Sequence, residues 1–177
     1  VCEGGNADMD DCGVCFGNNE SMDACGDCGG SVTDPLECLV HYDLNINSTG
    51  ESHLVIFLDS ILGLEPDDEI GVFDLNGVIE TVDAGEDPQY GEVLVGATIW
   101  NAAQVEISAI MSLDLSDFGG PILNGAVDGN EVTIRVYDAS EEMEYNTTAV
   151  FETGGQFGDL FTVVTTLQFD GVADCSG

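Results

Sequence analysis

Cysteine is the residue type with the clearest chemical potential in this chain, and its spacing is regular. Gaps of nine and two residues alternate through the first 38 positions, which gives two interleaved series with a period of 13 residues. Such a short period indicates a tandem repeat with almost no apolar core, which must be held by covalent bonds, metal or both. The seven cysteines are Cys2, Cys12, Cys15, Cys25, Cys28, Cys38 and Cys175.

The spacing leaves the pairing of these cysteines open, because six cysteines allow fifteen connectivities. We expect three disulfides, each closing one nine-residue gap: Cys2–Cys12, Cys15–Cys25 and Cys28–Cys38. In this expected pairing Cys175 has no partner within the chain. Neighbouring CxxC pairs could instead bind zinc tetrahedrally, but the flanking cysteines favour disulfides. A disulfide framework in a short chain indicates an oxidising, extracellular environment.

Carboxylates form the second chemically active group. The chain has 35 Asp and Glu but only one Lys or Arg, Arg135, for a formal charge of −34. Self-repulsion at this density disfavours the compact state, so the sequence predicts either bound cations or a surface suited to concentrated salt. Calcium is the sharper prediction, because it takes hard oxygen ligands. Because the chain has no basic face, it is not expected to bind nucleic acid or an anionic membrane. The sequence contains no run of eighteen apolar residues, so no membrane-spanning segment is expected.

The first repeat has the best arrangement of calcium ligands. Asn6, Asp8 and Asp10 alternate on a glycine-rich turn, which is typical of a loop that wraps one ion. The second repeat has fewer candidate calcium ligands, and acidic turns later in the chain supply further candidates. The candidate metal ligands are Asn6, Asp8, Asp10, Asp11, Asn19, Asp23, Asp68, Asp74 and Asn76. Further acidic turn residues considered for this role are Asp67, Glu69, Asp114, Asp117, Asp128 and Asp138.

The remainder of the chain must supply the elements that position these groups. Alternating apolar residues predict strands at 53–58, 70–73, 78–82, 93–99, 105–111, 132–137, 147–151 and 161–169. Asn76-Gly77 predicts a hairpin turn between two of them. Val132, Ile134 and Val136 should share one face. About nine short strands predict an all-β chain, an antiparallel β-sandwich of immunoglobulin-like or jelly-roll type, preceded by a loop-rich disulfide and calcium repeat.

Two groups of motifs resemble known families. The stretches DCGVCFG at 11–17 and CGDCGG at 25–30 resemble the DCxGxCxGG-type cysteine-rich repeats of large secreted bacterial surface proteins, which are distantly similar to thrombospondin type 3 calcium repeats. That resemblance implies a stiff spacer stabilised by calcium and disulfides. The stretches DEIGVFD at 68–74 and RVYD at 135–138 resemble a β-sandwich domain repeated in secreted bacterial surface proteins, which implies an exported protein.

The two ends of the chain complement each other. Residues 174–177, DCSG, followed by the opening residues VCEGG restore the DCxGxCxGG motif. We therefore expect identical units in a linear array, either as one polypeptide or as separate subunits, with the odd cysteine available for linkage to a neighbouring array. The expected organisation is a spacer at 1–38, a β-sandwich at 39–173 and the start of the next repeat at 174–177.

Catalysis is not expected. His41 and His53 have no nucleophile motif nearby, and among 35 acids some carboxylate pair will always resemble a glycosidase dyad. The only tryptophan, Trp100, lies in an apolar run and is expected in the core. Three N-x-S/T sequons mark candidate glycosylation sites: Asn19, Asn47 and Asn146.

These observations favour a non-enzymatic extracellular unit that runs head to tail with copies of itself into a calcium-stabilised fibre or stalk. An adhesin or carbohydrate-binding module that recognises surface glycans is the first alternative. A secreted hydrolase is the second, and it would need a deep acidic cleft that the sequence does not indicate.

Overall fold

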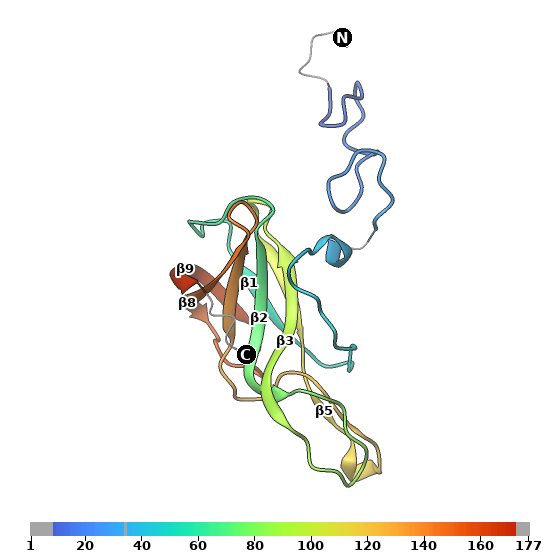
Figure 1. Ribbon diagram of the computed structural model, residues 1–177, viewed down its shortest axis with the longest axis vertical. Coiled ribbons are helices and arrows are strands. Elements are labelled where there is room, and N and C mark those ends of the chain that lie inside the picture. The colour runs from blue at the N-terminus through green and yellow to red at the C-terminus, as the bar shows by residue number, and fades with distance from the viewer. Residues whose placement is uncertain (1–8, 34, 173–177) are drawn as a thin grey trace. The chain divides into compact units, whose positions relative to one another are not determined.

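The chain divides into two compact units, which we call the cysteine-rich unit (Val1–Leu39) and the β unit (Val40–Gly177). The structure is a computed structural model that describes residues 9–33 and 35–172 (Figure 1). Within those residues, no helix is both long and apolar enough to cross a membrane.

The cysteine-rich unit contains two copies of the same 13-residue turn. The backbone N–H of Asp10 donates to the carbonyl of Val14 in the first copy, and that of Asp23 donates to Asp27 in the second, at 3.0 Å in both. Antiparallel bridges repeat with the same offset, joining Met9 to Cys15 and Met22 to Cys28. The short 3-10 helix η2 (Pro35–Cys38) follows. The period seen in the sequence is therefore a period of the backbone.

The β unit is built on one seven-stranded sheet with the order β3-β2-β7-β8-β9-β1-β4. Paired strands such as β2 and β3 run side by side in Figure 1. The ladders of this sheet are antiparallel except for β1 with β9, which is parallel. The strands are β1 (Ser52–Phe57), β2 (Glu69–Val78), β3 (Tyr90–Ile99), β4 (Val105–Ile110), β7 (Thr133–Asp138), β8 (Met143–Thr153) and β9 (Thr162–Val172).

Two further short strands, β5 (Leu113–Asp114) and β6 (Ile122–Leu123), pair with each other and form a second, smaller sheet. The 3-10 helix η3 (Ser116–Phe118) lies between them in the sequence. The sequence pattern did not predict these two strands, because a two-residue strand carries no alternation.

The large sheet curls over so that its first and last strands, β3 and β4, pack against each other. Gly96 of β3 makes that approach possible, since a Cβ there would lie 2.4 Å from the side chain of Ile107 in β4. One apolar cluster fills the interior and includes Val55, Phe57, Ile70, Val72, Val95, Ile107, Ile134, Val136 and Val164. The predicted all-β sandwich is confirmed.

Most of the strand predictions hold, but the strand at 78–82 and the hairpin before it do not: residues 79–81 belong to no strand, and Val82 makes an isolated bridge with Ile122. Val132, Ile134 and Val136 are all buried, as their alternation predicted, and Trp100 is in the core with 2% of its surface exposed. The predicted hairpin at Asn76-Gly77 does not form, because β2 continues through it to Val78 with a register shift against β3. A Cβ on Gly77 would lie 2.5 Å from Val93 and 2.9 Å from the carbonyl of Gly125, so this glycine permits close packing and not a turn.

Candidate functional site

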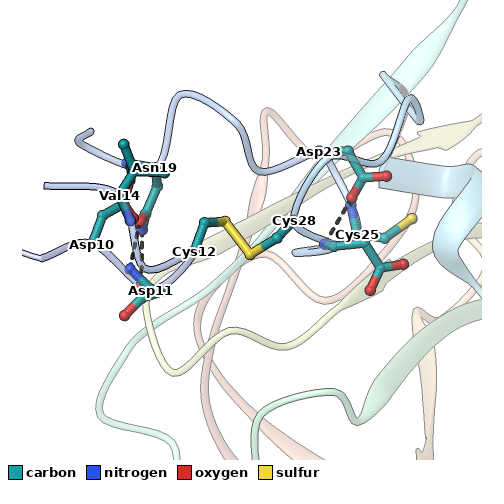
Figure 2. The surroundings of a disulfide bond; sticks show 9 residues. Asp10, Asp11, Cys12, Val14, Asn19, Asp23, Cys25 and Cys28 are labelled. Atoms are coloured by element: carbon teal, nitrogen blue, oxygen red, sulfur yellow. Dashed lines mark hydrogen bonds between the residues drawn. A yellow bond between two sulfur atoms is a disulfide. The ribbon is translucent and has the colours of Figure 1, made fainter.

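The Asp10 carboxylate organises the first turn of the cysteine-rich unit. Its Oδ1 accepts a hydrogen bond from the backbone N–H of Val14 at 2.7 Å, and its Oδ2 accepts one from the N–H of Asn19 at 3.0 Å (Figure 2). A Cβ on Gly17 would lie 2.2 Å from Oδ2, so the carboxylate occupies the space that a side chain would take. One carboxylate thus ties together residues from both ends of the turn.

Asp23 does the same in the second turn. Its Oδ1 accepts from the N–H groups of Cys25 at 3.0 Å and Asp27 at 2.9 Å, and its Oδ2 accepts from that of Val32 at 3.2 Å. A Cβ on Gly30 would lie 1.9 Å from Oδ2. The hydrogen bond from Asp27 is the main reason that the pKa of Asp23 lies below its ordinary value of 3.8. Donors four and nine residues after the aspartate, and a glycine seven after it, therefore recur in both copies.

Asp11 and Asn19 close the first turn from outside. The N–H of Asp11 donates to Asn19 Oδ1 at 3.0 Å, and Asn19 Nδ2 donates to Asp11 Oδ2 at 2.8 Å. Both polar atoms of the Asn19 side chain are therefore engaged, although the residue begins a sequon. The other two sequon asparagines, Asn47 in a loop and Asn146 in β8, are exposed.

The disulfide pairing expected from the nine-residue gaps is wrong. Cys12 bonds to Cys28, and Cys25 bonds to Cys38, with Cα–Cα distances of 5.4 and 5.3 Å. The gap prediction assumed that each disulfide closes one turn, whereas the Cys12–Cys28 bond joins the first turn to the second (Figure 2). Cys15 is also disulfide-bonded. Of the remaining predicted cysteines, Cys2 and Cys175 lie outside the described residues. These bonds indicate an oxidising environment.

Asp74, a candidate calcium ligand in the β unit, is fully buried and accepts hydrogen bonds at both oxygens. Oδ1 accepts from the N–H of Asn76 at 2.8 Å and Oδ2 from that of Val127 at 2.8 Å. The Nδ2 of Asn130 donates to both oxygens at 2.9 Å and to the carbonyl of Asn76 at 3.0 Å. Asp74 and Asn130 therefore connect β2 to the loop before β7, and the sequence pattern did not single out Asn130.

Asp68 has a similar role at the other end of β2. It is 2% exposed, its Oδ2 accepts from the N–H of Glu65 at 2.8 Å, and its Oδ1 accepts from that of Ala139 at 3.1 Å. Burial raises the pKa of Asp68 above 3.8 against the lowering effect of these two bonds, and the nearby Asp138 carboxylate adds to the rise. This carboxylate joins the loop before β2 to the turn after β7.

Glu69 makes the most extensive set of these contacts and is also 2% exposed. Its Oε1 accepts from the N–H of Val40 at 2.5 Å, and its Oε2 accepts from that of Tyr42 at 2.9 Å. The N–H of His41 lies 3.1 Å from each oxygen. Three consecutive backbone donors thus converge on one buried carboxylate. We call Val40–Tyr42, the first residues of the β unit, the entry segment.

The side chains of the entry segment also pack on the β unit. The His41 ring stacks on Tyr137 with centroids 4.1 Å apart, and the Tyr42 hydroxyl donates to Glu144 at 2.9 Å. Burial, reinforced by the Glu144 charge, raises the pKa of Tyr42, so its hydroxyl stays protonated and donates. The entry segment is therefore fixed to the sheet by backbone and side chains together.

The described carboxylates do not gather into an evident metal centre. Among residues 9–33 and 35–172, no three His, Cys, Asp or Glu side chains are grouped as a metal site would require. Asn6 and Asp8, the other members of the first predicted calcium loop, lie outside the described residues. The carboxylates of Asp10, Asp23, Asp68 and Asp74 all accept backbone N–H groups. Oxygens of these four carboxylates are therefore engaged with backbone donors.

Comparison with known proteins yields no relative: neither a protein-family model, nor a curated protein, nor a solved structure matches this chain.

Proposed function

We propose that this chain is a non-enzymatic structural unit of an extracellular or cell-surface fibre or stalk, in which a braced spacer carries a β-sandwich. The observation that carries the proposal is the pair of equivalent turns around Asp10 and Asp23, linked by Cys12–Cys28. A segment that repeats its hydrogen bonds and links its turns covalently resists extension along the chain. That property suits a spacer better than it suits an enzyme.

The fixed entry segment supports the same proposal. A chain under tension would pull first on the residues where a spacer joins its domain. Here the entry segment is held to the β unit by the Glu69 carboxylate and by the hydrogen bond from the Tyr42 hydroxyl to Glu144. We propose that copies of the unit follow one another in a linear array.

Electron microscopy and light scattering of the purified full chain under non-reducing conditions test the array. We expect linear oligomers whose length increases with protein concentration, since association follows mass action. A chain that stays monomeric under every salt, calcium and concentration condition overturns the array. The spacer part of the proposal is tested separately, by the stiffness of the cysteine-rich unit.

Calcium is the second part of the proposal. It is supported by the alternation of Asn6, Asp8 and Asp10 and by the formal charge of −34. We expect calcium to raise the melting temperature more than magnesium at equal ionic strength, and Asp8→Asn to remove that difference. Asp59→Asn makes the same charge change at an exposed position of the β unit and should keep it. Equal effects of the two cations on all three proteins would overturn the calcium proposal.

A further inference from the structure

Two adjoining cavities on the β unit form a groove that the structural role does not use. The first has a volume of about 350 Å³ and the second about 470 Å³. Ser112 and Asp128 line both cavities, so the two share a wall. Each volume is within the usual range for a small-molecule site, and cavities that adjoin can each take one part of an extended ligand.

The first cavity is predominantly polar. Its wall includes the carboxylates of Glu51, Asp128 and Asp159 and the hydroxyl of Ser52. His53 also lines it and is 3% exposed, with its Nε2 2.8 Å from the Thr162 hydroxyl. Burial lowers the pKa of His53, so the imidazole is neutral at neutral pH and does not offset the carboxylates.

The second cavity has a partly apolar wall. Tyr90, at the start of β3, and Pro88 line it, together with Val127 and the carboxylate of Asp114. Tyr90 leaves 55% of its surface exposed. An exposed ring beside a cavity offers a surface on which a ligand can stack.

We propose that this groove binds a short oligosaccharide of amino sugars, with one sugar ring stacked on Tyr90 and the neighbouring ring held by the carboxylates of the first cavity. A pyranose ring has an apolar C–H face, which fits an aromatic ring, and a hydroxylated rim, which needs hydrogen-bond acceptors. The groove supplies both kinds of surface in adjoining cavities.

Charge selects the kind of sugar. Four carboxylates line the two cavities, from Glu51, Asp114, Asp128 and Asp159, and no Lys or Arg is among the described residues of either wall. This arrangement repels anionic sugars and attracts a protonated amine. A basic peptide would share the charge, but it would not need a flat apolar face beside hydroxyl groups, so the sugar is the better fit.

Calorimetric titration of the full chain with the defined tetramer of glucosamine, at about 0.15 M salt to suppress non-specific attraction, tests the proposal. We expect Tyr90→Ala to weaken binding about tenfold and the isosteric Asp128→Asn about two- to fivefold. Thermal unfolding would show whether each variant is folded. If Tyr90→Ala does not fold, the affinity of Asp128→Asn alone decides the test.

Matched controls separate the groove from the overall negative charge. Phe118→Ala removes an aromatic side chain that is 90% exposed, and Asp59→Asn removes one exposed charge; neither residue lines the cavities, and neither variant should change the affinity. Control variants that lose as much affinity as the groove variants overturn the site. Equal affinity for the fully N-acetylated tetramer overturns the amine preference, and tetralysine binding with the same dependence on Tyr90 overturns the sugar.

Discussion

The cysteine-rich unit and the β unit hold their backbones with different main forces but share one polar device. The β unit has a continuous apolar core, whereas Val14 and Phe16 of the cysteine-rich unit are 47% and 65% exposed. Disulfides take the place of a core there. In both units, loops are organised by carboxylates that accept backbone N–H groups, as at Asp10 and at Asp74.

The shared device follows from composition. A buried carboxylate needs donors, and a chain with one Lys or Arg cannot supply them as side-chain cations. Backbone N–H groups and neutral side chains such as Asn130 are the donors that remain, and irregular segments present several N–H groups together. The balance differs between the two carboxyls: the hydrogen bond from Asp27 lowers the pKa of Asp23, whereas burial raises the pKa of Asp68 despite its backbone hydrogen bonds.

Reduction of the disulfides should produce the largest difference in stability between the two units. Each bridge, closing a loop of 13 or 16 residues, stabilises the folded cysteine-rich unit by about 3 kcal/mol. We expect a thiol-free phosphine reductant to abolish the amide-exchange protection of Val14 and Val32 in nuclear magnetic resonance spectra. Trp100, the only tryptophan and a residue of the β core, should keep its native emission, because residues 39–174 contain no cysteine.

Persistence of the Val14 and Val32 protection after complete reduction would show that the carboxylates alone hold the turns. Loss of the native Trp100 emission would show that the β unit depends on the spacer, and would contradict the separation of the two units.

Glu69→Gln should have the next largest effect, confined to the β unit. The amide retains one acceptor oxygen but turns an NH₂ group toward backbone donors, so we expect the free energy of unfolding to fall by about 2 to 3 kcal/mol. Urea unfolding monitored by Trp100 fluorescence measures this. Glu86→Gln, at an exposed loop position, is the matched control and should be neutral. Equal stability of the two variants would mean that the entry segment is not held by the Glu69 charge.

Acid should produce the smallest effect, with opposite sign at Asp23 of the cysteine-rich unit and Asp68 of the β unit. The pKa of Asp23 is lowered, so its stabilising contribution is complete above its ordinary value of 3.8 and is lost as the pH falls through the lowered pKa. The pKa of Asp68 is raised, so its contribution is present below 3.8 and is lost as the pH rises through the raised pKa. Carboxyl carbon chemical shifts should place the Asp23 midpoint below 3.8 and the Asp68 midpoint above it. The reverse order would contradict the role of burial.

The strands were predictable because alternation reports directly on burial. Val132, Ile134 and Val136 needed only the two-residue period to be assigned to the core. The hairpin predicted at Asn76-Gly77 was wrong, because a glycine that permits close packing has the same sequence signature as a glycine in a turn. Spacing likewise identified the cysteine repeat but not its pairing, since the bonds depend on how one turn lies against the next.

The polar site was harder to predict for a chemical reason. An aspartate that accepts backbone N–H groups and one that binds calcium both occur in glycine-rich turns, so Asp10 and Asp74 fit either role in the sequence. Which donors face the oxygens depends on how the turn folds. Glu69 was one acid in a run of three, and its partners lie 27 to 29 residues earlier, beyond the reach of any local pattern.

Arg135 has a practical consequence of its own. Its guanidinium binds Glu92 with both terminal nitrogens, at 2.8 and 2.6 Å, and lies over the Phe73 ring in the middle of the sheet. Because the chain contains no other Lys or Arg, trypsin has a single place to cut, and the backbone there is paired on both sides, with β2 and β8. Cleavage into two fragments therefore requires the sandwich to open, which makes brief trypsin treatment a direct count of unfolded molecules.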